Sequence, residues 1–330
     1  MTGSQITRTE LTAAQVSEVL ALVDAARRAD GVAPLSEHGM LRLRYDSASQ
    51  PGARDFIATV DGEIAGYAYL DPPSDHGGEV TGELVVHPER RRQGLGRALT
   101  GELAAAADGH VLRLWAHGDL PAAAALARAA GFDRFRALWQ MRRSLREPLD
   151  QPVLPAGRTL RTFVPGQDED DWLGLNGRAF AKHPEQGGWT RHDLELRERE
   201  PWFDPAGFFI AEANGAMAGF HWTKVHPPGE QEGSPDPGAP PGPASPGTGE
   251  VYVVGVDPAE QGSGLGRALT LAGLHYLRDL GLAQVMLYVD EDNGPAIRMY
   301  EALGFTRATV DAMYRSASPG DRSPRTPLAG

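Results

Sequence analysis

The sequence predicts two tandem copies of one mixed α/β domain, each with a glycine-rich loop suited to bind phosphate. Seven residues, Gly-Leu-Gly-Arg-Ala-Leu-Thr, occur twice, at 94–100 and at 264–270. Each copy lies between a β-like run and an amphipathic helical segment. Glycines before a helix let the backbone turn with its N–H groups free, and these donors and the positive end of the helix dipole attract phosphate. A polyphosphate ligand is therefore the first hypothesis.

The repeat extends well beyond the loop, which indicates duplicated domains rather than a duplicated motif. Three pairs of segments match between the halves: 86–97 with 256–267, 114–132 with 287–305, and 56–66 with 209–219. The last pair is a strand–turn–strand pattern with Asp-Gly or Asn-Gly at the reversal. We expect a first domain at 1–145, a Pro-rich linker at 146–157, a second domain at 158–316, a Pro/Gly insertion at 227–249 and a disordered tail at 317–330.

The elements expected in the two domains follow the same order. In the first domain we expect helices at 12–29, 37–45, 95–107 and 121–130, and strands at 54–60, 64–70, 80–86, 111–115 and 132–142. In the second we expect strands at 159–164, 208–213, 216–225, 250–256, 284–289 and 305–314, and helices at 168–180, 190–199, 264–280 and 295–303.

Composition narrows the class of partner to a small molecule. A chain of 330 residues exceeds what one core normally contains, which agrees with two domains. The net charge of −12 argues against nucleic acid, and no basic amphipathic helix suggests a membrane surface. No cysteine is present, so disulfides and thiolate catalysis are excluded, and residues 1–10 carry no apolar signal core. We therefore expect a cytoplasmic protein, and we expect it to be a monomer. We expect no metal, because His183, His221 and His226 do not have the spacing of metal ligands.

The order of elements and the pattern Arg/Gln-x-x-Gly-x-Gly at 91–96 and 261–266 resemble the GCN5-related N-acetyltransferase family. In that family a mixed sheet splays at a bulge, the pantetheine arm of acetyl-CoA enters like an added strand, and the pyrophosphate lies on the amides of the loop. The resemblance implies acetyl-CoA as co-substrate. A single such loop is often only a packing device. The dinucleotide fingerprint fits less well, because Arg267 stands where glycine is required.

The two copies differ where the family's chemistry takes place. The resemblance implies that Tyr300, on the helix after the fifth strand, protonates the departing thiolate. Glu250 is the candidate general base, acting through water, because an unperturbed carboxylate is a poor base. At the positions of Tyr300, Asn293 and Glu250 the first copy has Ala127, Leu120 and Val80. We expect a catalytic second copy and an inactive first copy that binds acetyl-CoA beside the basic run 90–92, although such a run is also typical of a solvated loop.

More specific segments, at 83–88, 183–189, 219–227 and 249–257, resemble a two-domain branch of the family. Its members transfer acetyl from acetyl-CoA to the cysteinyl amine of a cysteine–glucosamine–inositol conjugate, a cysteinyl glycoside. The implied substrate contacts are Glu37, Glu185, Lys224, Glu250 and Tyr288. The implied acetyl-CoA contacts are Val254, Gly255, Val256, Gln261, Gly262, Ser263, Gly264, Leu265, Gly266, Arg267, Asn293, Gly294, Pro295, Ala296, Ile297 and Arg298. A second nucleotide site would comprise Leu84, Val85, Val86, Arg92, Gln93, Gly94, Leu95, Gly96 and Arg97.

Strand alternation predicts which of these side chains share a face. Phe220, Trp222 and Lys224 would point one way, and Glu250, Tyr252 and Val254 would share a face of the neighbouring strand. Simpler roles stay open: a surface ion pair for Lys224, solvent exposure for Glu185, a helix start after the cap Ser36 for Glu37, and core packing for Tyr288 and Tyr300. Two other functions also stay open, namely acetylation of another amine and acetyl-CoA sensing without catalysis.

Overall fold

The computed structural model describes residues 4–46, 53–73, 78–227 and 247–317, and it divides the chain into two compact units. Unit 1 comprises residues 1–138 and 309–330, and unit 2 comprises residues 139–308. Most of the Pro/Gly insertion and of the expected disordered tail lies outside the described residues. The units are described one at a time.

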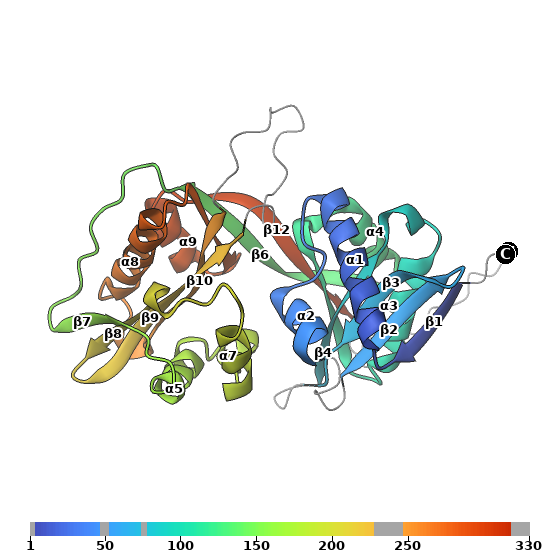
Figure 1. Ribbon diagram of the computed structural model, residues 1–330, viewed down its shortest axis with the longest axis horizontal. Coiled ribbons are helices and arrows are strands. Elements are labelled where there is room, and N and C mark those ends of the chain that lie inside the picture. Colours follow the sequence, from blue (N-terminus) through green and yellow to red (C-terminus); the bar gives the residue numbers. More distant parts are fainter. Residues whose placement is uncertain (1–3, 47–52, 74–77, 228–246, 318–330) are drawn as a thin grey trace. The chain divides into compact units, whose positions relative to one another are not determined.

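Unit 1 is a mixed sheet with helices on both faces (Figure 1). Its elements are β1 (Ser4–Thr9), α1 (Ala13–Asp30), α2 (Glu37–Leu41), β2 (Arg54–Val60), β3 (Glu63–Leu70), β4 (Glu79–Val86), α3 (Leu95–Ala106), β5 (Val111–Ala116), α4 (Pro121–Ala129), the start of β6 (Phe132–Ser144) and the end of β12 (Thr306–Ser316). Strands β1 to β4 pair antiparallel in sequence order, and β4 pairs parallel with β5. Helix α1 packs on one face and α3 on the other.

Unit 2 repeats this plan. Its elements are β7 (Arg158–Thr162), α5 (Glu169–Ala179), α6 (Pro184–Gly187), α7 (Arg191–Glu198), β8 (Phe208–Ala213), β9 (Ala216–His226), β10 (Thr248–Val256), α8 (Leu265–Asp279), β11 (Gln284–Asp290) and α9 (Gly294–Ala302), with the second part of β6 and the start of β12. The strand order is β6-β11-β10-β9-β8-β7. Helices α8 and α9 pack on one face, and α5 with α7 on the other (Figure 1).

The sheet of unit 2 splays between its two central parallel strands. Strands β10 and β11 pair only from Gly249–Val285 to Val251–Leu287, although both continue beyond. On its other edge β10 pairs with β9, and a bulge makes Tyr252 the extra residue between Val251 and Val253. In unit 1 the register of β3 and β4 runs without a shift from Gly66–Val86 to Leu70–Gly82. The bulge therefore distinguishes the two copies.

The end of the chain belongs to the first unit rather than to the second repeat. Strand β12 pairs antiparallel with β5, from Ala312–Ala116 to Arg315–Arg113, and Ala312 and Tyr314 are buried in the core of unit 1. Conversely, Met141 and Leu145 are buried in the core of unit 2. The sequence repeat assigned residues up to 145 to the first domain and residues 158–316 to the second. The units of the structure instead exchange these end segments.

Most expected elements are present within a few residues, and three features are new. Strand β1 and helix α6 had no sequence signal, since β1 contains one apolar residue, Ile6, and α6 has only four residues. The α-helix expected at 37–45 ends at Leu41, and a π-helical turn follows it over Arg42–Asp46. No helix in the described ranges is long and apolar enough to cross a membrane.

Candidate active site

The two glycine-rich loops have the same backbone conformation. In unit 2, Gly262 and Gly264 have φ of 79° and 90°, and in unit 1 the aligned Arg92 and Gly94 have φ of 63° and 91°. Gly94 and Gly264 are the N-caps of α3 and α8, and neither helix start has a side-chain cap. Both loops therefore present a helix N-terminus suited to a phosphate group. A non-glycine residue rarely adopts the conformation of Arg92, so unit 1 keeps this geometry despite local strain.

The basic run beside the loop of unit 1 is partly structural. The Arg91 guanidinium makes two 2.7 Å bonds to the Asp30 carboxylate at the end of α1 and donates to Val86 O at 3.2 Å. Arg90 lies 3.8 Å from the carboxylate of Glu63. Arg91 therefore joins the loop to α1, so the basic run is not simply a freely solvated loop.

The helices that follow the fifth strand of each repeat begin differently. The Asn293 side chain accepts a bond from Ala296 N at 3.2 Å and so caps α9. Leu120, which the sequence repeat aligns with Asn293, is likewise the N-cap of α4 but makes no side-chain cap bond. The aligned residues Leu120 and Asn293 thus occupy equivalent positions at the start of a helix. Only Asn293 caps its helix through the side chain.

A buried carboxylate and histidine lie at the centre of the unit 2 sheet. Glu250 on β10 pairs across the strands with Lys224 on β9. His226 Nε2 lies 2.6 Å from Glu250 Oε2, and the two side chains are 5% and 8% exposed. Paired residues share a face of a sheet, so Lys224, His226 and Glu250 form one polar group on the face covered by α5 and α7.

Aromatic rings lie beside the ammonium group of Lys224. Lys224 Nζ lies 4.5 Å from the ring centre of Trp202 and 5.3 Å from that of Tyr252. The Tyr252 hydroxyl accepts a 2.7 Å bond from Arg197, whose guanidinium stacks on Trp189 at 3.8 Å. Lys224 is 9% exposed, so it is not a surface ion-pair residue. Cation–π contacts of this kind are stronger when they are desolvated.

The bulge corrects one expectation about these strands. Tyr252 and Val253 both pack with the aromatic cluster that contains Trp222, whereas Val254 packs on the other face with the cluster that contains Tyr300. Strict alternation had placed Val254 on the same face as Tyr252. That expectation was wrong, because the extra residue at 252 shifts the alternation by one.

Tyr300 lies on the face of the sheet covered by α8 and α9. It is 8% exposed, and its ring packs edge-on against Phe305 with centroids 5.7 Å apart. Burial raises the pKa of Tyr300 to about 12. The hydroxyl of Tyr300 is therefore protonated at neutral pH and could donate its proton. The ring also packs in the core, as the simpler interpretation of this residue expected.

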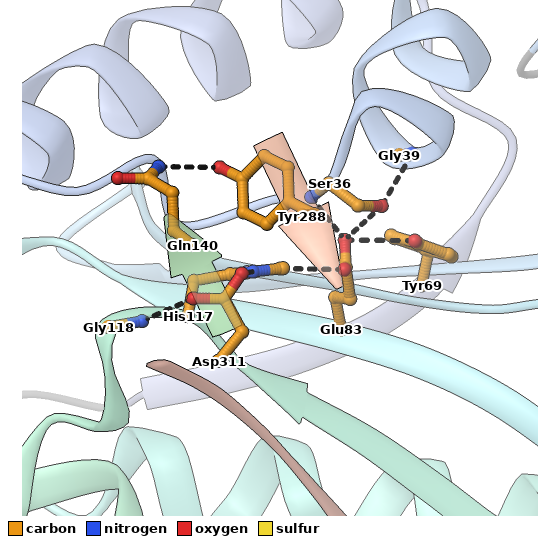
Figure 2. A network of polar contacts seen from close by, with 9 residues as sticks. All are labelled: Ser36, Gly39, Tyr69, Glu83, His117, Gly118, Gln140, Tyr288 and Asp311. Carbon is orange, nitrogen blue, oxygen red and sulfur yellow. Dashed lines mark hydrogen bonds and ion pairs between the residues drawn. The ribbon is translucent and has the colours of Figure 1, made fainter. Parts of the chain in front are cut away.

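The remaining substrate residues of the prediction are distributed over three elements. Tyr288 lies on β11, and its hydroxyl accepts a 2.9 Å bond from Gln140 on β6 (Figure 2). Glu185 lies in α6, and its side chain is outside what the structure describes. Glu37 is the first residue of α2 in unit 1, directly after the N-cap Ser36.

Unit 1 contains a buried polar network that sequence reasoning missed (Figure 2). His117 bonds Glu83 at 2.9 Å and Asp311 at 3.0 Å. Glu83 also accepts bonds from the Tyr69 hydroxyl at 2.9 Å and from Ser36 N at 3.0 Å. Unit 1 thus has a carboxylate, Glu83, on its central strand β4, and several hydrogen-bond donors bind this carboxylate.

Charges within this network shift its pKa values. Burial alone would lower the pKa of His117, but hydrogen bonds to Asp311 and Glu83 and their charges raise it to about 10. Burial alone would raise the pKa of Glu83, but its bonds to His117, Ser36 and Tyr69 lower it. At neutral pH this is a buried imidazolium between two carboxylates.

The three histidines considered for a metal do not converge. His221 is fully buried on the opposite face of β9 from His226, where its Nδ1 bonds Leu269 O at 2.8 Å and burial lowers its pKa to about 4. His183 lies 3.4 Å from Asp290. Within the described ranges, no three histidine or acidic side chains are grouped as a metal site would require.

A splayed mixed sheet, a glycine loop at a helix start and their repetition in two units define a tandem acetyltransferase of the GNAT fold. Residues 20–132 and 177–305 each match the acetyltransferase (GNAT) family. A tandem GNAT protein from the clavulanic acid biosynthesis pathway superposes with a TM-score of 0.69 at 22% identity, covering 97% of this chain and 100% of its own. A GCN5-related N-acetyltransferase from Sphaerobacter thermophilus gives 0.65 at 22% identity, covering 94% and 95%.

Two curated relatives are similar in sequence to this chain over almost its whole length. The mycothiol acetyltransferase of Thermomonospora curvata is 58% identical, covering 94% of this chain and 96% of that protein. The mycothiol acetyltransferase of Thermobispora bispora is 60% identical, covering 90% and 94%. The chain therefore belongs to the acetyltransferase (GNAT) family, as an acetyl-CoA-dependent N-acetyltransferase closely related to the mycothiol acetyltransferases.

Proposed function

We propose that the protein transfers acetyl from acetyl-CoA to the cysteinyl amine of the cysteine–glucosamine–inositol conjugate, desacetylmycothiol, giving mycothiol and CoA. The observation that carries this proposal is the identity of 58% to a mycothiol acetyltransferase over 94% of the chain. The site chemistry supports it, because a buried carboxylate and an ammonium group flank the splayed strands where an acetyl-CoA arm would enter. That the protein is a cytoplasmic monomer without a metal stays a prediction.

The loop residues 261–267 would bind the diphosphate of acetyl-CoA through their amides, with β10 residues 254–256 and the turn 293–298 along the rest of the co-substrate. This assignment is supported by the positive φ of Gly262 and Gly264 at the start of α8. The loop at 92–97 and strand residues 84–86 would form a second nucleotide site in unit 1, which we propose to be catalytically inactive because Val80 and Ala127 replace the proton-handling residues.

Glu250 would take a proton from the cysteinyl ammonium, directly or through water, so that the nitrogen lone pair can attack the thioester carbonyl. A C–N bond forms as the C–S bond breaks, and backbone N–H groups near residues 254–256 would stabilise the charge on the carbonyl oxygen. Tyr300 would then protonate the CoA thiolate. No covalent enzyme intermediate is required. Acceptor binding would use Lys224, Tyr288, Glu185 and Glu37.

The test is direct turnover followed by mass spectrometry. Purified protein is incubated with acetyl-CoA and the cysteinyl glycoside, and the N-acetyl product is distinguished from an S-acetyl product by its stability to hydroxylamine. A panel of other amines, including aminoglycosides and peptide N-termini, is run in parallel. N-acetylation of the cysteinyl glycoside with the highest kcat/KM supports the proposal. A higher kcat/KM for another amine refutes the substrate, and binding of acetyl-CoA without turnover of any amine refutes catalysis.

A further inference from the structure

A second buried residue lies against the carboxylate that we propose as the general base. His226 is the last residue of β9, and its Nε2 contacts Glu250 Oε2 at 2.6 Å. Both side chains are more than nine-tenths buried. A buried carboxylate with a charge-assisted or neutral hydrogen bond is more ordered than one without it, because its terminal torsion is otherwise broad.

We propose that His226 is a positioning residue that fixes the carboxylate of Glu250 for proton transfer. The imidazole bonds one oxygen, Oε2, and thereby directs the other oxygen, Oε1, as the one that receives the proton. Proton transfer depends on the heavy-atom separation and direction, so a wrongly rotated carboxylate would transfer the proton slowly. This inference rests on the proposed function, because only there does Glu250 handle a proton.

The first repeat shows that the pair is not needed to form the fold. Continued without a gap beyond the matched segments, the two sequence alignments place Val80 at the position of Glu250 and Pro73 at that of His226. Unit 1 nevertheless pairs β3 with β4 over Gly66–Val86 to Leu70–Gly82, and Asp71 N continues the pairing to Thr81 O at 2.8 Å. The equivalent strands thus pair although β3 has no histidine to contact a carboxylate on β4. A buried polar pair also contributes little net stability compared with apolar residues of similar volume.

The neighbours of the pair make a role in orientation more suitable than a role in binding the acceptor. Lys224, which we propose to bind the acceptor, lies opposite Glu250 across the strands and supplies the cationic group at this position. The imidazole nitrogen that faces Glu250 is engaged by the carboxylate. His226 therefore acts on the substrate through Glu250.

The test compares two substitutions of His226 in the full chain. His226→Leu removes the hydrogen bond and keeps a similar volume, whereas the amide of His226→Gln can still donate to Oε2. The exposed residue His192 provides the control His192→Gln. We expect a 10- to 100-fold lower kcat for His226→Leu, as is typical when a supporting hydrogen bond is lost. We expect the KM for acetyl-CoA to change less than about twofold, and His226→Gln to recover most of the rate.

A double-variant cycle separates this inference from the proposed function. If His226 acts through Glu250, adding His226→Leu to Glu250→Gln causes no further loss of kcat. Additive losses, a wild-type rate for His226→Leu, or no recovery in His226→Gln would each overturn the inference. A wild-type rate for Glu250→Gln would instead overturn the proposed general base. Thermal midpoints and CoA titrations of each variant show whether it is folded, and the Gln variant decides the outcome if the Leu variant is not.

Discussion

The buried imidazolium of unit 1 predicts a distinctive dependence of stability on pH. The pKa of His117 is about 10 in the folded protein, against about 6.5 in an unfolded chain. A group whose pKa is raised on folding stabilises the native state fully below its unfolded pKa and loses that contribution as pH rises through the folded pKa. The stabilisation by His117 should therefore be complete at pH 6 and decline from about pH 6.5 to pH 10.

The magnitude follows from the same values. The step from 6.5 to about 10 corresponds to at most about 5 kcal/mol, and removing one partner of a buried ion pair costs about 3–5 kcal/mol. We expect His117→Gln to lower the free energy of unfolding by about 3–5 kcal/mol at pH 7. Its deficit relative to wild type should shrink by up to about 1.4 kcal/mol per pH unit towards pH 10, because the wild type loses the imidazolium there.

The assay is urea unfolding followed by circular dichroism at pH 6, 7, 8, 9 and 10, for wild type, His117→Gln and the exposed control His192→Gln. The difference between wild type and His117→Gln isolates the network of His117, Glu83 and Asp311, since the titrating residues outside it are common to both proteins. A difference that stays constant from pH 7 to pH 10 would refute the assignment of a buried imidazolium. A similar pH-dependent difference for the control would refute its attribution to His117.

Three further predictions concern single positions. Glu250→Gln should lower kcat by about 10²- to 10⁴-fold with little change in acetyl-CoA binding, as measured by steady-state kinetics and calorimetry, and an unchanged kcat would contradict its role. Tyr300→Phe should lower kcat while the thermal midpoint stays within a few degrees, and a kcat equal to wild type would exclude it as the acid. Leu120→Asn should stabilise unit 1 by about 1 kcal/mol by supplying the missing cap of α4, a gain readable in urea unfolding and contradicted by a lower midpoint.

The repeat made most of the architecture predictable from sequence. Glycine loops, Asp-Gly and Asn-Gly turns and the matched segments are local signals, and they placed most strands and helices within a few residues. The assignment of the chain end was not predictable in this way. Residues 312–315 resemble the last strand of the second repeat, yet they pair with β5 of unit 1. Which sheet receives a strand is decided by long-range pairing and core burial, which a local pattern does not contain.

The site was predictable in its residues more than in its contacts. Lys224, Glu250 and Tyr300 were identified by resemblance, and the structure places all three in buried positions. The aromatic rings around Lys224 come from the turn after α7 (Trp202) and from the bulged strand β10 (Tyr252), so their approach to the ammonium depends on the tertiary fold. His226 was considered only as a metal ligand, because a sequence cannot show that its imidazole meets a carboxylate twenty-four residues later.

A carboxylate on a central strand is present in both units, and its partners distinguish the two cases. Glu83 accepts bonds from the Tyr69 hydroxyl, a backbone N–H of Ser36 and the charged His117, and each of these favours the ionised form. Taking up a proton would break these bonds, so Glu83 is a weaker base than a carboxylate without such donors. The inactivity that we propose for unit 1 then follows from this engagement of Glu83 as well as from the loss of residues aligned with Glu250 and Tyr300.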